Sequence, residues 1–204
     1  KKDQKIGKDF VTDNQTYIIS WTTTPWTLPG NVALAVGEKI IYEGFEISDE
    51  YLILAKDRVE AVFGEKRKSD FQVTGKDLAG LKYEPLFDIK KLHSDSSYKI
   101  YSADFVTTTD GAGVVHTAVM YGEDDYQLGV KVGLPQYHTV NKQGRFNEDV
   151  LIVGGLKARD QKTDEKIFEY LKEKNYLYKV ERYTHDYPFC WRCGTAILYY
   201  ANNS

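Results

Sequence analysis

Short runs of β-branched and aromatic residues alternate with polar turns along much of the chain. Such runs predict β-strands, because branched and aromatic side chains pack well on a pleated surface. The predicted strands cover residues 16–21, 32–36, 40–47, 51–55, 71–73, 99–101, 105–108, 114–118 and 197–200. Pro25 and Pro29 exclude a helix interior and a central strand from the segment that follows the first of these strands.

Three segments carry helix signals instead. Residues 161–175 have an apolar stripe at helical spacing, and Thr163 or Asp164 can cap this helix. Residues 56–63 and 123–133 predict shorter helices, each with a glycine at its C-terminal end. Many short strands with few helices predict a mainly β fold with helical insertions and a β-barrel-like core.

The composition fits one globular domain. The chain has 204 residues, of which 42% are hydrophobic and 28% charged, and this apolar content excludes disorder. No run approaches the roughly 18 apolar residues of a membrane span. The N-terminus has no apolar core of a signal peptide, and the only methionine is Met120, so we expect a chain that was excised from something longer or processed.

The net charge and the cysteine count bear on the possible binding partners and on the cellular location. The net charge is −3, so an RNA partner would make a small contact here or be gripped mainly elsewhere. The two cysteines are too few for a disulfide framework. A reducing, cytoplasmic location is the natural expectation.

Four threonines form the first candidate site. Thr22, Thr23, Thr24 and Thr27 surround two prolines, and each offers a donor, an acceptor and a methyl group. A rigid loop with these hydroxyls can line a small polar pocket. The alternative is that the hydroxyls bond their own backbone.

A histidine and two acids form the second candidate. His116 follows a predicted strand, and Asp124 and Asp125 lie in the first turn of a predicted helix. A single histidine there is more often a satisfied core residue, and such acids are more often caps. The glycines of residues 111–113 lack the third glycine of a dinucleotide fingerprint, and no Gly-x-Ser-x-Gly elbow is present.

Cys190 and Cys193 form the third candidate. One Cys-x-x-Cys pair supplies two ligands, whereas a structural zinc site needs four. His185 is near, but its spacing matches no familiar zinc knuckle. Either the pair is half of a zinc site completed elsewhere or it is two buried thiols, and strand-like flanks argue against a redox role.

Three segments in order then resemble the editing (CP1) domain of isoleucyl-tRNA synthetases. Residues 21–31, Trp-Thr-Thr-Thr-Pro-Trp-Thr-Leu-Pro-Gly-Asn, are similar to its threonine-rich signature. Residues 111–118 followed by Gly-Glu-Asp-Asp-Tyr at 122–126 resemble the second signature, and residues 185–193 resemble the segment that returns to the catalytic body. The three segments span nearly the whole chain from residue 16.

Details within these segments discriminate among relatives. Valyl and leucyl enzymes have Arg-Pro-Glu or Arg-Pro-Asp in the first motif, so Thr24-Pro25-Trp26 favours the isoleucyl type. The family commonly has proline where Val119 stands and threonine or serine where Ala112 stands. The nucleotide-binding signatures of the synthetic site are absent from the sequence, so this chain is not expected to activate an amino acid.

The resemblance implies a closed β-barrel-like core, with residues 1–187 as the editing domain and 188–204 as the start of the return segment. It implies hydrolysis of misacylated valyl-tRNA(Ile) after transfer and leaves open whether valyl-adenylate is cleaved too. By the same resemblance, editing would need no cofactor, and a zinc site would be a feature of the full-length parent. The implied partners are the acceptor end of tRNA(Ile) and the remainder of the synthetase, with no membrane, and we expect a monomer.

The resemblance also assigns roles to individual residues. Asp125 would bind the α-ammonium of the misattached amino acid, since a carboxylate is the natural partner of a desolvated cation. His116 would be the pocket wall that admits valine but not isoleucine, and Thr27 would face the side chain of the misattached amino acid. Asp125 and His116, together with Thr22 and Thr23, form the expected catalytic set.

The remaining roles concern the substrate's nucleoside and the loop. Thr22, Thr23 and Thr24 would hold the terminal adenosine and the ester, while Asn31 and Trp21 support the loop. No general base is evident, so assistance by the neighbouring ribose hydroxyl is the expected route. Alternatives are a valyl-type editor that removes threonine, a free-standing deacylase, or a non-catalytic insertion that only binds the tRNA acceptor end.

Overall fold

The computed structural model describes residues 1–8, 10–13, 15–184 and 187–202. The chain divides into two units, and each is built from several separate stretches of sequence. The first unit contains residues 1–22, 32–85 and 95–117, and the second contains residues 23–31, 86–94 and 118–204.

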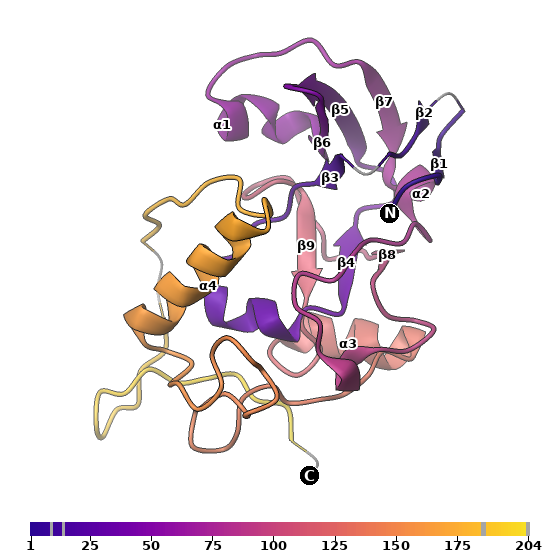
Figure 1. Cartoon of the computed structure of the whole chain (residues 1–204). Helices are drawn as coiled ribbons and strands as arrows, with labels where there is room; N and C mark the ends of the chain where they lie inside the picture. Colours follow the sequence, from indigo (N-terminus) through magenta and orange to yellow (C-terminus); the bar gives the residue numbers. More distant parts are fainter. Residues whose placement is uncertain (9, 14, 185–186, 203–204) are drawn as a thin grey trace. The chain divides into compact units, whose positions relative to one another are not determined.

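A four-stranded sheet in the first unit has the order β3-β6-β5-β7. Its strands are β3 (Thr16–Ile18), β5 (Ile41–Ile47), β6 (Glu50–Ala55) and β7 (Phe71–Thr74). β5 and β6 form an antiparallel hairpin, β7 pairs antiparallel with β5, and β3 pairs parallel with β6 (Figure 1).

A three-stranded sheet in the same unit has the order β8-β4-β9. The strands are β4 (Ala33–Val36), β8 (Lys99–Ser102) and β9 (Val114–Thr117). All four residues of β4 are buried, as expected for a central strand, and β4 runs parallel to β8 and antiparallel to β9 (Figure 1). A small hairpin of β1 (Lys5–Ile6) and β2 (Phe10–Val11) completes the strands of this unit.

Short helices connect these strands. The predicted helix at 56–63 is a 3-10 turn, η2 (Lys56–Arg58), followed by α1 (Val59–Phe63), and Gly64 ends it in the left-handed region at φ 78°. The sequence pattern did not predict α2 (Gly75–Leu78). A capping box starts α2, in which the Asp77 carboxylate accepts the Thr74 backbone N–H at 2.8 Å.

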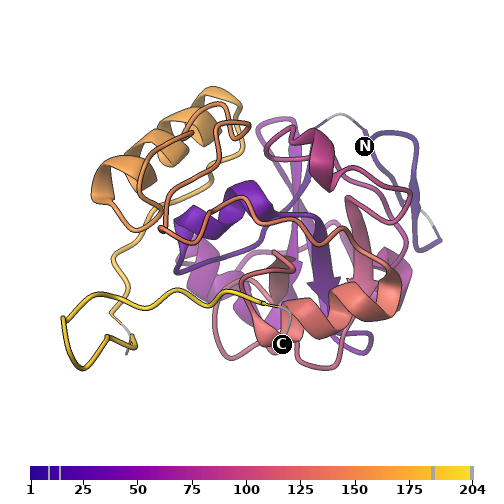
Figure 2. The same ribbon diagram turned by 90° about the horizontal axis from the view of Figure 1, so that it is seen from below.

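The second unit is mainly helical and irregular. It contains η1 (Pro25–Gly30), η3 (Lys90–Leu92), α3 (Glu123–Val132) and α4 (Gln161–Glu173). Ile167 and Leu171 of the α4 stripe are buried, and α4 contacts η1, as both views show (Figures 1 and 2). α3 ends at Gly133, whose φ is 72°, as the glycine pattern predicted.

Three local predictions are wrong. Residues 105–108 form no strand, because hydroxyls such as Thr107 and Thr109 bond each other at 3.0 Å, which competes with a ladder. Residues 197–200 form no strand either, since Tyr199 bonds Glu123 at 2.5 Å and Tyr200 stacks on a histidine ring. The cap of α4 is Asp160, whose carboxylate accepts the Lys162 N–H, and neither Thr163 nor Asp164.

Two predictions about architecture also change. Residues 25–30 form a 3-10 helix, which tolerates Pro25 in its first turn and is short enough to contain Pro29. The fold is mixed sheet and helix, and the strands of the described residues form separate open sheets instead of a closed barrel. None of the helices in the described ranges combines the length and the apolar character of a membrane span.

The core of the first unit contains one fully buried phenol. Tyr42 has no exposed surface, its hydroxyl donates to the Gly113 carbonyl at 2.7 Å, and it accepts the Gly37 N–H at 3.1 Å. Burial raises the pKa of this phenol to about 12, so the hydroxyl stays protonated. The side chain therefore ties β5 to the turn that begins β9.

Replacement of Tyr42 with phenylalanine should lower the free energy of unfolding by about 1–3 kcal/mol, because two buried backbone groups lose their partner. Urea denaturation of the purified chain measures this change. Tyr51→Phe is the matched control, since the Tyr51 hydroxyl bonds Glu46 at an exposed position and its loss should change stability little. Equal effects of the two changes would contradict the role of Tyr42.

Candidate functional site

The residues expected to form the site belong to different units. Trp21, Thr22 and His116 lie in the first unit. The others, which lie in the second unit, are Thr23, Thr24, Thr27, Asn31 and Asp125. The chain passes from the first unit to the second directly after Thr22 and again directly after Thr117, so both signatures lie at a crossing.

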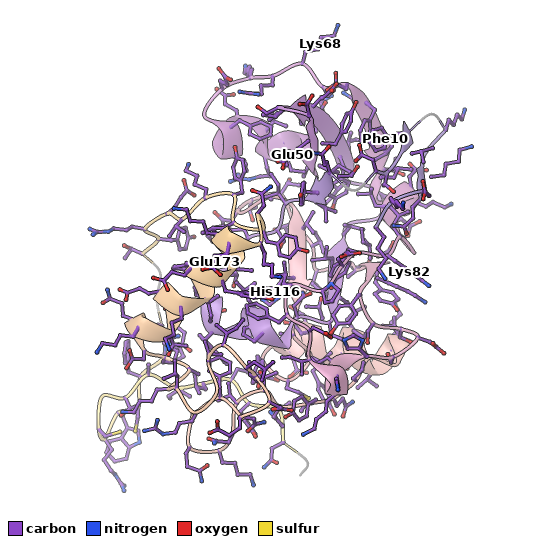
Figure 3. All side chains as sticks on the ribbon, viewed as in Figure 1. Phe10, Glu50, Lys68, Lys82, His116 and Glu173 are labelled. Atoms are coloured by element: carbon purple, nitrogen blue, oxygen red, sulfur yellow. The ribbon has the colours of Figure 1, made fainter. Side chains whose placement is uncertain are left out.

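β9 carries His116 (Figure 3), and the register of β9 places this residue opposite Leu34 of the central strand β4. The side chain is buried, with 8% of the residue exposed, and this burial lowers its pKa to about 4. The imidazole is therefore neutral at physiological pH. A neutral ring with so low a pKa is a weak base, although it still offers one donor and one acceptor.

Trp21 lies next to the same strand. Its backbone forms a bridge with Val115, the residue before His116, and its indole packs against the turn at Gly111. A Cβ at Gly111 would lie 3.1 Å from the Trp21 side chain, and the φ of Gly111 is +64°. The glycine therefore permits both the turn and the close approach of the indole. The support that Trp21 would give to the threonine-rich loop stays a prediction.

In the second unit, Thr24 and Thr27 lie at the start of η1. The Thr27 hydroxyl donates to the Thr24 carbonyl at 2.8 Å, and the Thr27 N–H donates to the same oxygen at 2.9 Å. The two hydroxyl oxygens are 3.3 Å apart. Thr27 is buried and Thr23 is exposed. The alternative of local backbone bonding holds for the Thr27 hydroxyl, because it donates to the Thr24 carbonyl. Asn31, which follows η1, is buried.

Asp125 lies in the first turn of α3 and is partly buried. One carboxylate oxygen, Oδ1, accepts the Ala118 N–H at 2.9 Å. Burial raises the pKa of this carboxyl to about 6, the nearby charge of Asp124 acts in the same direction, and the bond from Ala118 opposes it. Within the described part of the chain no lysine, arginine or histidine charge is among the causes of this shift.

A pocket of about 830 Å³ lies in the second unit. Thr24, Trp26 and Thr27 line it together with residues in and just before α3 and at the end of the chain: Tyr121, Glu123, Tyr126, Gln127 and residues of 187–188 and 197–202. The Trp26 and Tyr121 rings meet edge to face at 5.0 Å. Sequence reasoning assigned no role to Trp26, Tyr121 or Tyr126, although two of them lie inside the signatures that it quoted.

Cys190 and Cys193 lie in a tight turn between residues that pair across a short ribbon. The Cys190 N–H donates to the Thr195 carbonyl at 2.8 Å, and hydrogen bonds to Thr195 lower the pKa of the Cys193 thiol. The described residues contain no group of three or more histidine, cysteine or acidic side chains placed to hold a metal. His185 lies outside the described residues, and the half zinc site stays a prediction.

Solved structures identify the class of domain. The crystal structure of GlLeuRS-CP1 matches 84% of this chain and 87% of its own, with a TM-score of 0.60 and 13% identity. The Plasmodium knowlesi cytosolic leucyl-tRNA synthetase editing domain matches 91% of this chain and 84% of its own, with a TM-score of 0.54 and 11% identity. The fold is that of a synthetase CP1 editing domain. No protein-family model matches the chain.

Sequence relatives identify the family. The isoleucine–tRNA ligase of Clostridium tetani is 43% identical over 208 residues, and that of Clostridium novyi is 44% identical over 208 residues; both matches cover the whole of this chain. The Methanothermobacter marburgensis enzyme is 40% identical over 202 residues. The chain belongs to the isoleucine–tRNA ligase family and spans about 20% of the length of the clostridial relatives. The resemblance stated above is confirmed.

The state of His116 can be tested directly. Because burial lowers its pKa to about 4, the imidazole should stay neutral by NMR down to that pH. The unfolded chain takes up this proton near pH 6.5, so the contribution of His116 to stability is complete above pH 6.5 and lost as the pH falls to about 4.

The full loss from His116 is about 3 kcal/mol. His116→Gln should remove it, and the difference between the wild-type and variant urea stabilities cancels the opposite contribution of Asp125. A histidine that titrates near its ordinary value would contradict the burial of the ring.

Proposed function

We propose that this chain is the proofreading module of an isoleucyl-tRNA synthetase and hydrolyses valine from misacylated valyl-tRNA(Ile). Isoleucine and valine differ by one methylene, worth roughly 1–3 kcal/mol in a binding pocket, a limit for which this enzyme family is the well-known case. A second hydrolytic site that excludes isoleucine removes the resulting errors. Valyl-adenylate carries the same aminoacyl group and is a second proposed substrate.

The observation that carries this proposal is the Asp125 carboxylate. It is partly buried, and no cation of the described residues is among the groups that shift its pKa. A desolvated anion without a protein cation is a favourable site for an external one. An aminoacyl ester brings an ammonium group next to its reactive carbonyl, so Asp125 can orient the ester while it binds the amine.

His116 supports the selectivity part of the proposal. A neutral, buried imidazole carries no positive charge, and its low pKa argues against a role as general base. Its strand, β9, pairs with the buried strand β4, which suits a rigid wall that discriminates by size. We therefore assign His116 to the exclusion of isoleucine.

The hydroxyl groups complete the proposed mechanism. A water oxygen attacks the ester carbonyl, the bond to the ribose oxygen breaks, and the departing oxygen takes a proton as valine leaves. Thr22, Thr23 and Thr24 would hold the ester and terminal adenosine, and the neighbouring ribose hydroxyl would assist the water. Asn31 and Trp21 would hold the loop in place. The tRNA(Ile) acceptor end and the remainder of the synthetase are the proposed partners.

Asp125→Asn tests the role of the carboxylate. The amide oxygen can still accept the Ala118 N–H, but the charge is gone, so hydrolysis of valyl-tRNA(Ile) should fall by about 10- to 100-fold. The difference between the wild-type rate and the variant rate should increase with pH, with a midpoint at about pH 6.

Asp124→Asn is the matched control, because Asp124 is exposed in the same helical turn. It should leave the rate within about twofold of the wild type, since surface changes are usually small. A wild-type rate for Asp125→Asn would remove Asp125 from the mechanism and favour an insertion that only binds the acceptor end.

His116→Ala tests the wall. Removal of the ring should let isoleucyl-tRNA(Ile) be hydrolysed, while hydrolysis of the valyl ester continues. Parallel assays with isoleucyl-, valyl- and threonyl-tRNA measure this selectivity, and the threonyl assay also tests a valyl-type function. Unchanged rejection of isoleucine by a folded variant would exclude His116 as the discriminating residue.

A further inference from the structure

Two helices of this chain carry an aspartate at the same position and use it in opposite ways. In α2, Thr74 is the N-cap and Asp77 is the third residue of the helix; its carboxylate accepts the Thr74 N–H at 2.8 Å and hydroxyl at 2.7 Å. In α3, Gly122 is the N-cap and Asp125 is the third residue. The Asp125 carboxylate reaches beyond the cap to the N–H of Ala118 at 2.9 Å.

The residue at the N-cap accounts for this difference. A Cβ at Gly122 would lie 2.1 Å from Oδ2 of Asp125, which is closer than real Cβ contacts, and 3.1 Å from its Cγ, which is tight. Gly122 has φ −156° and ψ 146°, an extended conformation that any residue can adopt. The glycine is therefore required by the position of the carboxylate and not by the backbone.

The absence of a side chain at this cap has a cost for the helix. Serine, threonine, aspartate and asparagine are the favoured N-caps because their side chains accept a free N–H of the first turn. α3 has no side-chain cap hydrogen bond, whereas α4 has one from Asp160. The start of α3 thus lacks the stabilising side-chain hydrogen bond of an N-cap. In return, the Asp125 carboxylate can occupy the space next to Gly122.

We propose that Gly122 is a positioning residue for editing, which keeps the Asp125 carboxylate out of helix capping and available to the substrate ammonium. The inference rests on the proposed function for the identity of that ammonium. The Tyr126 N–H donates to the Gly122 carbonyl at 2.9 Å, so the glycine is fixed to the helix that carries Asp125. Oδ1 is held by Ala118, and Oδ2 occupies the space that a side chain at residue 122 would fill.

Gly122→Ser tests this inference, because serine both fills that space and can cap the helix. The Asp125 carboxylate should turn toward the new cap, as Asp77 does, and lose the Ala118 N–H. Hydrolysis of valyl-tRNA(Ile) by the 204-residue chain should fall roughly 10- to 100-fold. The urea midpoint should stay the same or rise, which a merely structural glycine would not show.

Two further readouts separate positioning from damage. The carboxyl carbon of Asp125 should titrate at lower pH in Gly122→Ser than in the wild type by NMR, as expected for a capping carboxylate. The ester of the 2-hydroxy analogue of valine lacks the ammonium, so its slower hydrolysis should differ little between the two proteins. Gly122→Ala supplies the displacement without the cap.

The outcomes distinguish the inference from the function on which it rests. If Asp125→Asn is impaired but Gly122→Ser and Gly122→Ala hydrolyse valyl-tRNA(Ile) at the wild-type rate, the inference is overturned and the proposed function stands. If the wild type hydrolyses no aminoacyl ester, the proposed function fails. The NMR titration then still decides the position of the carboxylate, and an unchanged Asp125 midpoint in Gly122→Ser overturns the inference.

Discussion

The pairing of β9 with β4 is the constraint on which the rest of the first unit depends. β4 is buried at every position and has a hydrogen-bonded strand on each side, so its register cannot shift without exposing the core. That register places His116 opposite Leu34 and Trp21 beside Val115. The Tyr42 hydroxyl connects the turn before β9 to the neighbouring sheet. The core that stabilises the first unit therefore also fixes the position of His116.

Burial acts on the two strongest candidate residues in the same sense. It lowers the pKa of His116 and raises that of Asp125, and in each case the neutral form gains. The consequence for the histidine is a ring without charge at physiological pH. The consequence for the aspartate is an anion that is costly to keep ionised until a cation arrives. In both residues the shift comes from burial, since desolvation is the largest cause of each.

Sequence patterns predicted the regular elements well where a side chain had one good environment. The run that became β4 and the glycines that end α1 and α3 were found because burial and a left-handed turn leave few alternatives. Residues 105–108 were misassigned because local hydroxyl bonds compete with strand pairing, a contest that propensity does not measure. The β-barrel-like core was expected from the number of strands, and its closure from the resemblance, but strand count does not determine which edges pair.

The candidate site was predictable in part. The signatures pointed to Asp125 and His116, but the chemical state of each depends on its burial in the folded chain, which a motif does not specify. The chain has 16 tyrosines, so composition alone could not show that Tyr121 and Tyr126 line the pocket. Gly122 has an ordinary extended φ, so no turn pattern marks it, and only the position of the carboxylate shows why it is glycine.

The order of segments within the two units has a consequence for synthesis of the chain. β4 ends at Val36, but its antiparallel partner β9 begins only at Val114, and residues of both units lie between them. A ribosome must therefore release most of the first unit before its central sheet can close. Contacts between residues so far apart in the sequence form slowly. Until β9 has been synthesised, β4 lacks this partner and is exposed to association with other chains.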